Sequence, residues 1–308
     1  MSAAWVAVGV RARAMSCRRV GRSGARGLAA GPTLSDALAT LARTPYGHDV
    51  RLGQTLAQAQ RAVVDTAVWN LRVLAGWAPR AGVTTLRVLL AGLEISNVEA
   101  QLQRFAGGQS PPPPYRLGAL ATAWPRLAAT TSIDELRAVL ATSWWGDPGG
   151  TTASEIGLAM RTSLADRTMA AVPAAGNWAA GATALLVAQA LAQGRRELPA
   201  ASAVAASRVV GPAALSATTL PELTAVLPAG ARWALAEVRD AEDLWQAEAG
   251  WWARVERDGL DLGRRAPAGP QALVSVVALL AVDAWRVRAA LEMAARGGSP
   301  AEVFDAVA

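Results

Sequence analysis

One helix-start pattern occurs three times along this chain of 308 residues, at residues 33–41, 132–140 and 219–227. Each copy begins with a hydroxyl residue, continues with an acidic residue in the first turn, and then places leucines at helical spacing. A hydroxyl side chain at that position is a typical N-cap, because it accepts a hydrogen bond from a free backbone N–H. The copies start 99 and 87 residues apart (132 − 33 and 219 − 132), which predicts three helical repeats of about 100 residues.

A second pair of similar segments supports the same period. Residues 94–102 align with residues 283–291, and both follow a leucine-rich run and lead into paired glycines. Their separation of 189 residues (283 − 94) is close to the 186 residues (219 − 33) between the first and third helix starts. The middle repeat carries only a weak version of this segment, at residues 185–194. In the alignment Glu94 corresponds to Asp283, and Asn97 to Arg286.

The composition favours helices throughout. Apolar residues make up 52% of the chain, and many of them are alanine, the strongest helix former. Runs of β-branched and aromatic residues, which are typical of strands, are scarce. We therefore expect an all-α fold with its own buried cores.

Four consecutive prolines and a Gly-Pro pair predict where the repeats meet. The prolines at residues 111–114 form a stiff, extended break, and Gly211-Pro212 forms a second one. The expected domains are three similar helical bundles, at residues 1–114, 115–212 and 213–308. Within the first, residues 3–20 are expected to form a basic helix and the glycine-rich residues 21–32 a linker.

Several kinds of chemistry are excluded by residue types that are rare or missing. The chain has no lysine, which excludes a Schiff base, and only His48 and Cys17 could act as soft metal ligands. No Gly-x-Ser-x-Gly elbow accompanies His48, which we expect at a loop or helix start. The glycine-rich residues 21–24 and 146–150 lack the preceding strand and the following Gly-Lys-Ser/Thr of a phosphate loop. We predict no catalytic centre, no cofactor and no metal, and the lone cysteine fits a reducing compartment.

The positive charge is concentrated at the N-terminus. Residues 1–35 hold six arginines and no acidic residue, while the whole chain also carries a net charge of +6. Three interpretations are open: a face for anionic lipid or an acidic partner, an arm that binds nucleic acid, and a transit peptide. The candidate partner-binding arginines are Arg11, Arg13, Arg18 and Arg22.

Two apolar segments are the best candidates for a membrane span. Residues 178–193 are interrupted by Thr183 and Gln189, and residues 272–282 fall short of the required length. Both are expected to be buried core helices, so we expect no transmembrane helix.

Four short motifs carry a family resemblance, and their order matters more than any one of them. The first is an Arg-x-Arg-x-Met helix start at residues 10–15, and the second is a Leu-x-x-Thr-x-Tyr-Gly helix end at residues 41–47. The third is an acidic-Ile-x-Asn-Val segment at residues 94–98, and the fourth is the stretch at residues 115–120 that opens the second repeat. Together with the period of about 100 residues, they resemble the C/d family of rotary V/A-type ATPases (ATP synthases), whose eukaryotic members carry the letter d.

The resemblance implies a non-catalytic rotor protein of the central stalk. Members of this family form a funnel of three helical domains in pseudo-threefold arrangement, which sits on the ring of membrane proteolipids and receives the central axle. The implied partners are the axle subunits, the proteolipid ring and possible anionic lipid headgroups, with no nucleotide. The implied location is the cytoplasmic face of the cell membrane, as a peripheral protein that serves ion transport or ATP synthesis.

Polar residues on the aligned segments are the second set of candidate partner-binding residues: Glu94, Asn97, Asp283 and Arg286. They either bond to neighbouring helix ends or face the funnel interior and bind the axle. The alternative function is a helical-repeat scaffold or a nucleic-acid-associated protein that uses the basic N-terminal arm. The charge balance beyond residue 35 argues against nucleic acid. Paired carboxylates such as Glu242 and Asp243 do not support an enzyme, because adjacent residues point to different faces of a helix.

Overall fold

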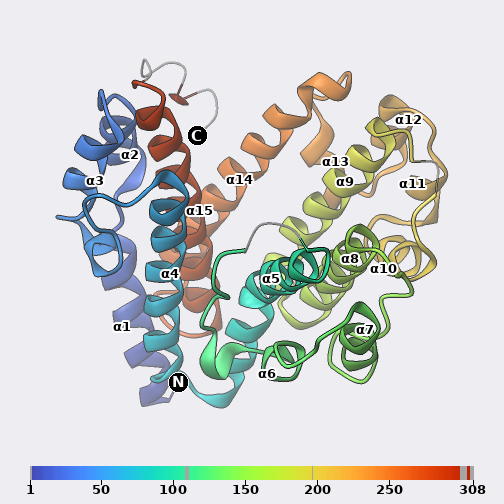
Figure 1. The fold of residues 1–308 in the computed structure, drawn as a ribbon, viewed down its shortest axis with the longest axis horizontal. Helices are drawn as coiled ribbons and strands as arrows, with labels where there is room; N and C mark the ends of the chain where they lie inside the picture. Colours follow the sequence, from blue (N-terminus) through green and yellow to red (C-terminus); the bar gives the residue numbers. More distant parts are fainter. Residues whose placement is uncertain (1, 108–110, 196, 299–303, 306–308) are drawn as a thin grey trace. The chain divides into compact units, whose positions relative to one another are not determined.

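The computed structural model describes residues 2–107, 111–195, 197–298 and 304–305 (Figure 1). Within these residues the regular structure is entirely helical and no strand occurs. The prediction of an all-α fold is confirmed. No helix in these ranges combines the length and the apolar character that a membrane span requires.

The helices differ widely in length. The helices of eight residues or more are α1 (Ala3–Cys17), α2 (Gly21–Ala29), α3 (Leu34–Leu41), α4 (Leu56–Ala75), α5 (Arg80–Phe105), α7 (Ile133–Ala141), α8 (Ala153–Ala171), α9 (Gly176–Ala192), α10 (Ala200–Val210), α14 (Leu244–Arg265) and α15 (Pro270–Ala295). The shorter ones are α6 (Trp124–Leu127), α11 (Pro212–Ser216), α12 (Leu220–Val226) and α13 (Ala229–Arg232), with 3₁₀ turns η1 (Pro45–His48), η2 (Gly118–Leu120), η3 (Pro173–Ala175), η4 (Trp233–Leu235) and η5 (Ala241–Asp243).

The chain packs into two compact units. Unit 1 comprises Met1–Leu86 and Trp252–Ala308, and unit 2 comprises Arg87–Trp251. The boundaries therefore fall inside α5 and α14, and not at the prolines or the Gly-Pro pair. Two points stay predictions. They are the pseudo-threefold funnel and the division into three domains at residues 1–114, 115–212 and 213–308.

Unit 1 is built around the C-terminal helix α15. In Figure 1 this red helix lies among the blue helices of the N-terminus, and it contacts α1, α2, α3 and α4. Most apolar side chains of α15 are buried, because neighbours surround the helix on several sides. The core joins residues from both ends of the chain, such as Leu38 and Leu41 with Leu291 and Phe304.

The prediction of a glycine-rich linker at residues 21–32 is wrong, because most of this segment forms helix α2. Its buried residues are Ala25, Leu28 and Ala29, which share one face at helical spacing. That face packs against α15. Burial of the apolar face against α15 thus outweighs the low helix propensity of glycine. The prediction of a linker considered only that propensity.

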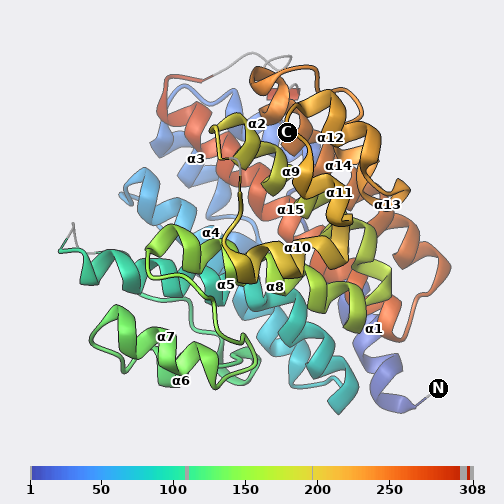
Figure 2. The same ribbon diagram turned by 90° about the vertical axis from the view of Figure 1, so that its right-hand side faces the viewer.

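Unit 2 contains two hydrophobic clusters. One collects residues of α9 and α10 with the short helices that follow, and the other collects residues of α5, α7 and α8. Helices α8 and α10 pack side by side, and α8 also packs on α9 (Figure 2). The prediction that residues 178–193 and 272–282 form buried core helices is confirmed by the burial of α9 and α15.

The three repeated helix starts are real N-caps. The side chains of Thr33, Ser132 and Thr219 each accept a hydrogen bond from the backbone N–H three residues further on. The second and third copies share a further detail. Glu135 accepts hydrogen bonds from the backbone N–H and the hydroxyl of Thr131, and Glu222 accepts the same pair from Thr218.

These bonds to backbone and hydroxyl donors lower the pKa of both Glu135 and Glu222. In the first copy the preceding residue is Pro32, which has no N–H to donate. There Asp36 accepts the hydroxyl of Thr33 instead. The sequence repeat is therefore also a repeat of hydrogen bonds, and its one departure has a local cause.

Candidate functional site

Among the described residues two carboxylates are fully buried, one in each unit. Glu94 of α5 is 0% exposed and Asp283 of α15 is 1% exposed. Each lies near the middle of a 26-residue helix. A buried carboxylate without partners is very unfavourable, so the surrounding donors explain why the two residues are tolerated there.

Glu94 binds the start of α6. Its carboxylate accepts the backbone N–H of Thr122 at 2.7 Å and that of Ala123 at 2.9 Å, and it also accepts the hydroxyl of Thr122. A fourth donor is the indole Nε1 of Trp145, at 2.7 Å. Glu94 thus fixes a helix start and a buried aromatic ring at one point of the unit 2 core.

Asp283 makes the same kind of arrangement in unit 1. It accepts the backbone N–H of Val20 at 3.1 Å and of Gly21 at 2.7 Å, which are the free donors at the start of α2. The hydroxyl of Tyr46 donates to it at 3.0 Å. Burial and the neighbouring charge of Asp283 raise the pKa of Tyr46 well above its ordinary value of 10.0, so this phenol stays a donor.

We call each arrangement a carboxylate node: a buried acid, the two backbone N–H groups at a helix start, and a donor on a buried aromatic ring. The aromatic members, Tyr46 and Trp145, are 99 residues apart (145 − 46), the same offset as the first two helix starts. Both follow a hydroxyl residue that accepts their backbone N–H, Thr44 at 3.2 Å and Ser143 at 3.1 Å. The two nodes therefore share their backbone geometry as well as their side chains.

Sequence reasoning found the acids of the nodes and missed the aromatic donors. The signal was present, since the segments Thr44-Pro45-Tyr46-Gly47 and Ser143-Trp144-Trp145-Gly146 are visibly alike. Tyr46 contacts Asp283 and Trp145 contacts Glu94, and both acids lie far away in sequence. The similarity of the two segments therefore did not identify these acids as their partners.

Asn97 and Arg286 lie one helical turn beyond the acids and are also buried, at 1% and 2% exposure. Asn97 exchanges two hydrogen bonds with the backbone of Tyr115, at 3.0 and 2.6 Å. Arg286 pairs with both oxygens of Glu256, at 3.0 and 2.9 Å, and this guanidinium lowers the pKa of Glu256. All four candidate residues thus have partners within their own unit, and a role for them in binding another protein stays a prediction.

The basic N-terminal segment forms α1 and α2, and α1 packs on α15. Three of its arginines pair with acids of the same unit: Arg19 lies 3.6 Å from Glu256, and Arg22 and Arg26 pair with Asp305. The guanidinium of Arg11 lies 3.8 Å from the ring centre of Trp77. Arg13 and Arg18 are exposed, and so are the paired residues Arg22 and Arg26. Exposed positive charge therefore extends from α1 into α2, although Arg22 and Arg26 share it with Asp305.

His48 ends the short turn η1, which agrees with the expectation of a loop or helix start. Its ring stacks on Trp69 at 4.1 Å between centroids, and its Nδ1 lies 2.8 Å from Asp49. Asp49 also accepts the hydroxyl of Thr66, at 2.9 Å. Among the described residues no three His, Cys, Asp or Glu side chains are grouped as a metal site requires.

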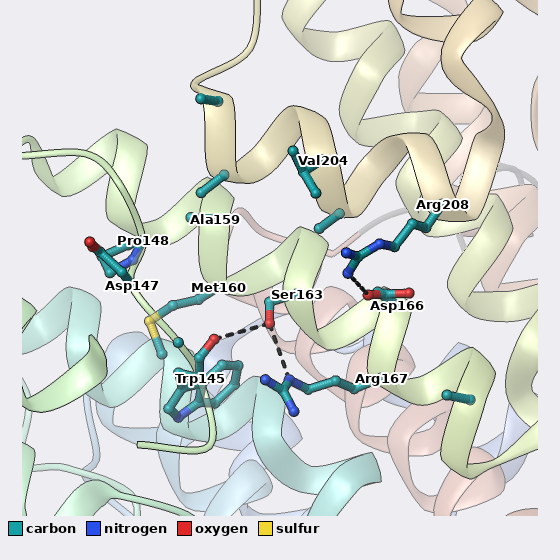
Figure 3. Close-up of a pocket in the computed structure, with 15 residues that line it drawn as sticks. Trp145, Asp147, Pro148, Ala159, Met160, Ser163, Asp166, Arg167, Val204 and Arg208 are labelled. Carbon is teal, nitrogen blue, oxygen red and sulfur yellow. Dashed lines mark hydrogen bonds and ion pairs between the residues drawn. The ribbon is translucent and has the colours of Figure 1, made fainter. Parts of the chain in front are cut away.

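A cavity of about 580 Å³ lies in unit 2 between α8, α10 and the loop after Trp145 (Figure 3). Ser163 donates to the carbonyl of Trp145 at 3.2 Å and accepts from Arg167 at 3.3 Å. Asp166 pairs with Arg208 at 3.2 Å. The polar side chains of this lining are thus held by hydrogen bonds or ion pairs within unit 2.

No protein-family model matches this sequence, and no curated protein matches it.

Proposed function

We propose that the protein is a non-catalytic coupling protein of the central stalk of a rotary V/A-type ATPase, of the C/d family. The observation that carries the proposal is the recurrence of the carboxylate node at two of the sequence landmarks. The acidic-Ile-x-Asn-Val segment, one of the motifs of the family resemblance, supplies the acid of the unit 2 node. The Leu-x-x-Thr-x-Tyr-Gly segment supplies the phenol of the unit 1 node.

In this role the protein connects the central axle to the membrane proteolipid ring and passes torque between them. Helical bundles suit that task, because a rotor part must resist bending. The nodes suit it too, since each ties a helix start to a long helix through charge-assisted hydrogen bonds. The partners are the axle subunits and the ring, at the cytoplasmic surface of the cell membrane, and the protein binds no nucleotide.

A nucleic-acid arm is less well supported. Three of the six N-terminal arginines pair with acids of unit 1, and the charge beyond residue 35 is balanced. A protein that binds along a phosphate backbone needs many unpaired cations on one face.

The direct test is co-purification with the axle subunit and the proteolipid ring encoded in the same genome. We expect a stable complex with both, and no ATP hydrolysis by the isolated chain. Failure to bind either partner, or ATP turnover by the purified chain that tracks its concentration, would contradict the proposal.

The exposed arginines give a second readout of the same complex. Changing Arg13 and Arg18 together to glutamine should weaken binding to the ring at low salt and change it little at high salt. The reason is that exposed charges are screened over about 8 Å at physiological ionic strength. Equal binding of variant and wild type at every salt concentration would contradict this contribution.

A further inference from the structure

A second cavity, of about 240 Å³, lies within unit 1 between α1, α4, η1 and α15. One part of its lining is cationic and consists of Arg11, Arg18 and Arg19. The only acid in the lining is Asp283. The formal charge around the cavity is therefore +3 − 1 = +2, which favours an anionic ligand.

The nearby acids, Asp283 and Glu256, already accept hydrogen bonds from other groups. Asp283 accepts three hydrogen bonds from Val20, Gly21 and Tyr46, as described above. Both oxygens of Glu256 are held by Arg286. Neither acid accepts a hydrogen bond from Arg18 or Arg19, although Glu256 lies 3.6 Å from Nη1 of Arg19.

Arg19 carries the strongest sign of an absent acceptor. Its Nε donates to the carbonyl of Ser16 at 2.9 Å, and its Nη1 lies 3.6 Å from Glu256. That Nη1 is buried, yet it has no hydrogen-bond partner among the described residues. A buried guanidinium N–H that donates no hydrogen bond is unfavourable, and an anion in the adjoining cavity would supply the acceptor.

Much of the remaining lining is apolar, and the cavity is partly open. Trp69 is 42% exposed and Val73 is 37% exposed, and Met15 and Leu280 are further apolar members of the lining. Large apolar side chains at the mouth of a cationic cavity suit a ligand with an anionic head and a carbon body. The volume is below the roughly 300–1,000 Å³ of drug-sized sites, so the part of the ligand that is enclosed must be small.

We propose that this cavity binds a small phosphomonoester, with Arg18 and Arg19 on the phosphate and the attached carbon atoms against Trp69 and Val73. A phosphomonoester carries a charge of about −1.5 to −2 at pH 7, which balances the lining. The guanidinium fork matches the geometry of its oxygens. The same group occurs in soluble phosphorylated metabolites and in lipids with a phosphatidate headgroup. This proposal does not rest on the coupling role proposed above, although both use Arg18.

The test uses the purified full-length chain and two probes. Glycerol 3-phosphate is titrated into the protein by calorimetry, and vesicles of phosphatidylcholine with and without phosphatidate are tested by flotation. Arg18→Gln removes a cation from the cavity lining, and we expect about tenfold weaker binding, the effect of one charge-assisted hydrogen bond. Arg13→Gln is the matched control, because Arg13 is an exposed arginine of α1, the helix that Arg18 caps, and does not line the cavity.

Binding of glycerol 3-phosphate that Arg18→Gln weakens and Arg13→Gln spares supports a soluble ligand. Binding only to phosphatidate vesicles, with the same pattern in the variants, supports a lipid headgroup. No binding of either probe overturns the proposal. Equal weakening by both variants also overturns it, because it would reflect the general charge of the segment and not the cavity.

Discussion

Glu94 and Asp283 act as acceptors for groups that would otherwise be buried without partners. In each node the acid satisfies two backbone N–H groups at a helix start and one aromatic donor. Loss of such an acid leaves several buried donors unpaired at once, which costs more than the loss of one hydrogen bond. The nodes are therefore expected to be sensitive points of the fold.

Replacing Glu94 with alanine tests this expectation. The backbone donors of Thr122 and Ala123 and the indole of Trp145 would lose their acceptor, and we expect the free energy of unfolding to fall by about 3–5 kcal/mol. Urea denaturation measures the change. Glu99→Ala on the same helix is the control: Glu99 pairs with Arg161 at a partly exposed position, and its loss should cost less than about 1 kcal/mol. Similar effects of the two substitutions would contradict a special role for the node.

The pair of Glu256 and Arg286 predicts a dependence of stability on pH. Because Arg286 holds the pKa of Glu256 below its ordinary value of 4.5, the pair stabilises the folded protein above that pH, and the contribution disappears as the pH falls through the lowered pKa. Glu256→Gln resembles the protonated acid, so it should lower the melting temperature at neutral pH. The difference from wild type should shrink as the pH falls below 4.5. A difference that stays constant at every pH would show that Glu256 does not act through its charge.

At the scale of residues, the sequence predicted the N-caps and singled out the acids but not their partners. The cap of Thr33 is local, because donor and acceptor are three residues apart. The contact between Gly21 and Asp283 spans 262 residues, and no local pattern encodes it. The candidate cavity was missed for the same reason, since Arg18 and Arg19 meet Trp69 only in the folded chain.

Helix α2 shows at the scale of elements how a distant partner decides a local conformation. Its glycines favour a flexible segment, yet Ala25, Leu28 and Ala29 give it one apolar face. The start of the helix is held by Asp283 through the N–H of Gly21, whose φ of +68° lies in the left-handed region. The long helices were easier to predict, because their apolar pattern extends over many turns.

Two glycines of α2 provide a matched pair of substitutions. Gly27 is exposed within the helix, and an added Cβ would meet no atom within 4 Å, so Gly27→Ala should stabilise the protein by about 0.5–1 kcal/mol. An added Cβ at Gly21 would also meet nothing, but the left-handed backbone should make Gly21→Ala destabilising by about 1–2 kcal/mol. Thermal unfolding of both variants checks this. No stabilisation by Gly27→Ala would indicate that the segment is not helical in solution.

At the scale of the whole molecule, the two ends of the chain belong to one unit and the middle forms the other. Unit 1 depends on α15, which provides Asp283 and much of the core around α2, α3 and α4. Unit 2 is a single continuous stretch with its own hydrophobic clusters. The sequence repeats do not reveal this division, because they mark similar segments and not which segments pack together.

Ending the chain after Arg265 removes α15 and separates the contributions of the two units. We expect the amides of α2, α3 and α4 to exchange rapidly with solvent, because their apolar faces lose the helix that covers them. The amides of α7, α8 and α9 should keep their protection. Hydrogen exchange read by mass spectrometry distinguishes the two sets, and loss of protection in both would mean that unit 2 requires α15 as well.

The attachment of α2 to Asp283 also sets an order of events during synthesis. The ribosome must add 262 residues after Gly21 before its partner exists, which takes roughly 13–50 s at about 5–20 residues per second. Meanwhile the continuous stretch of unit 2 leaves the exit tunnel complete. The first helices to be made are thus among the last to reach their final place, and their uncovered leucines are a natural substrate for chaperones during the wait.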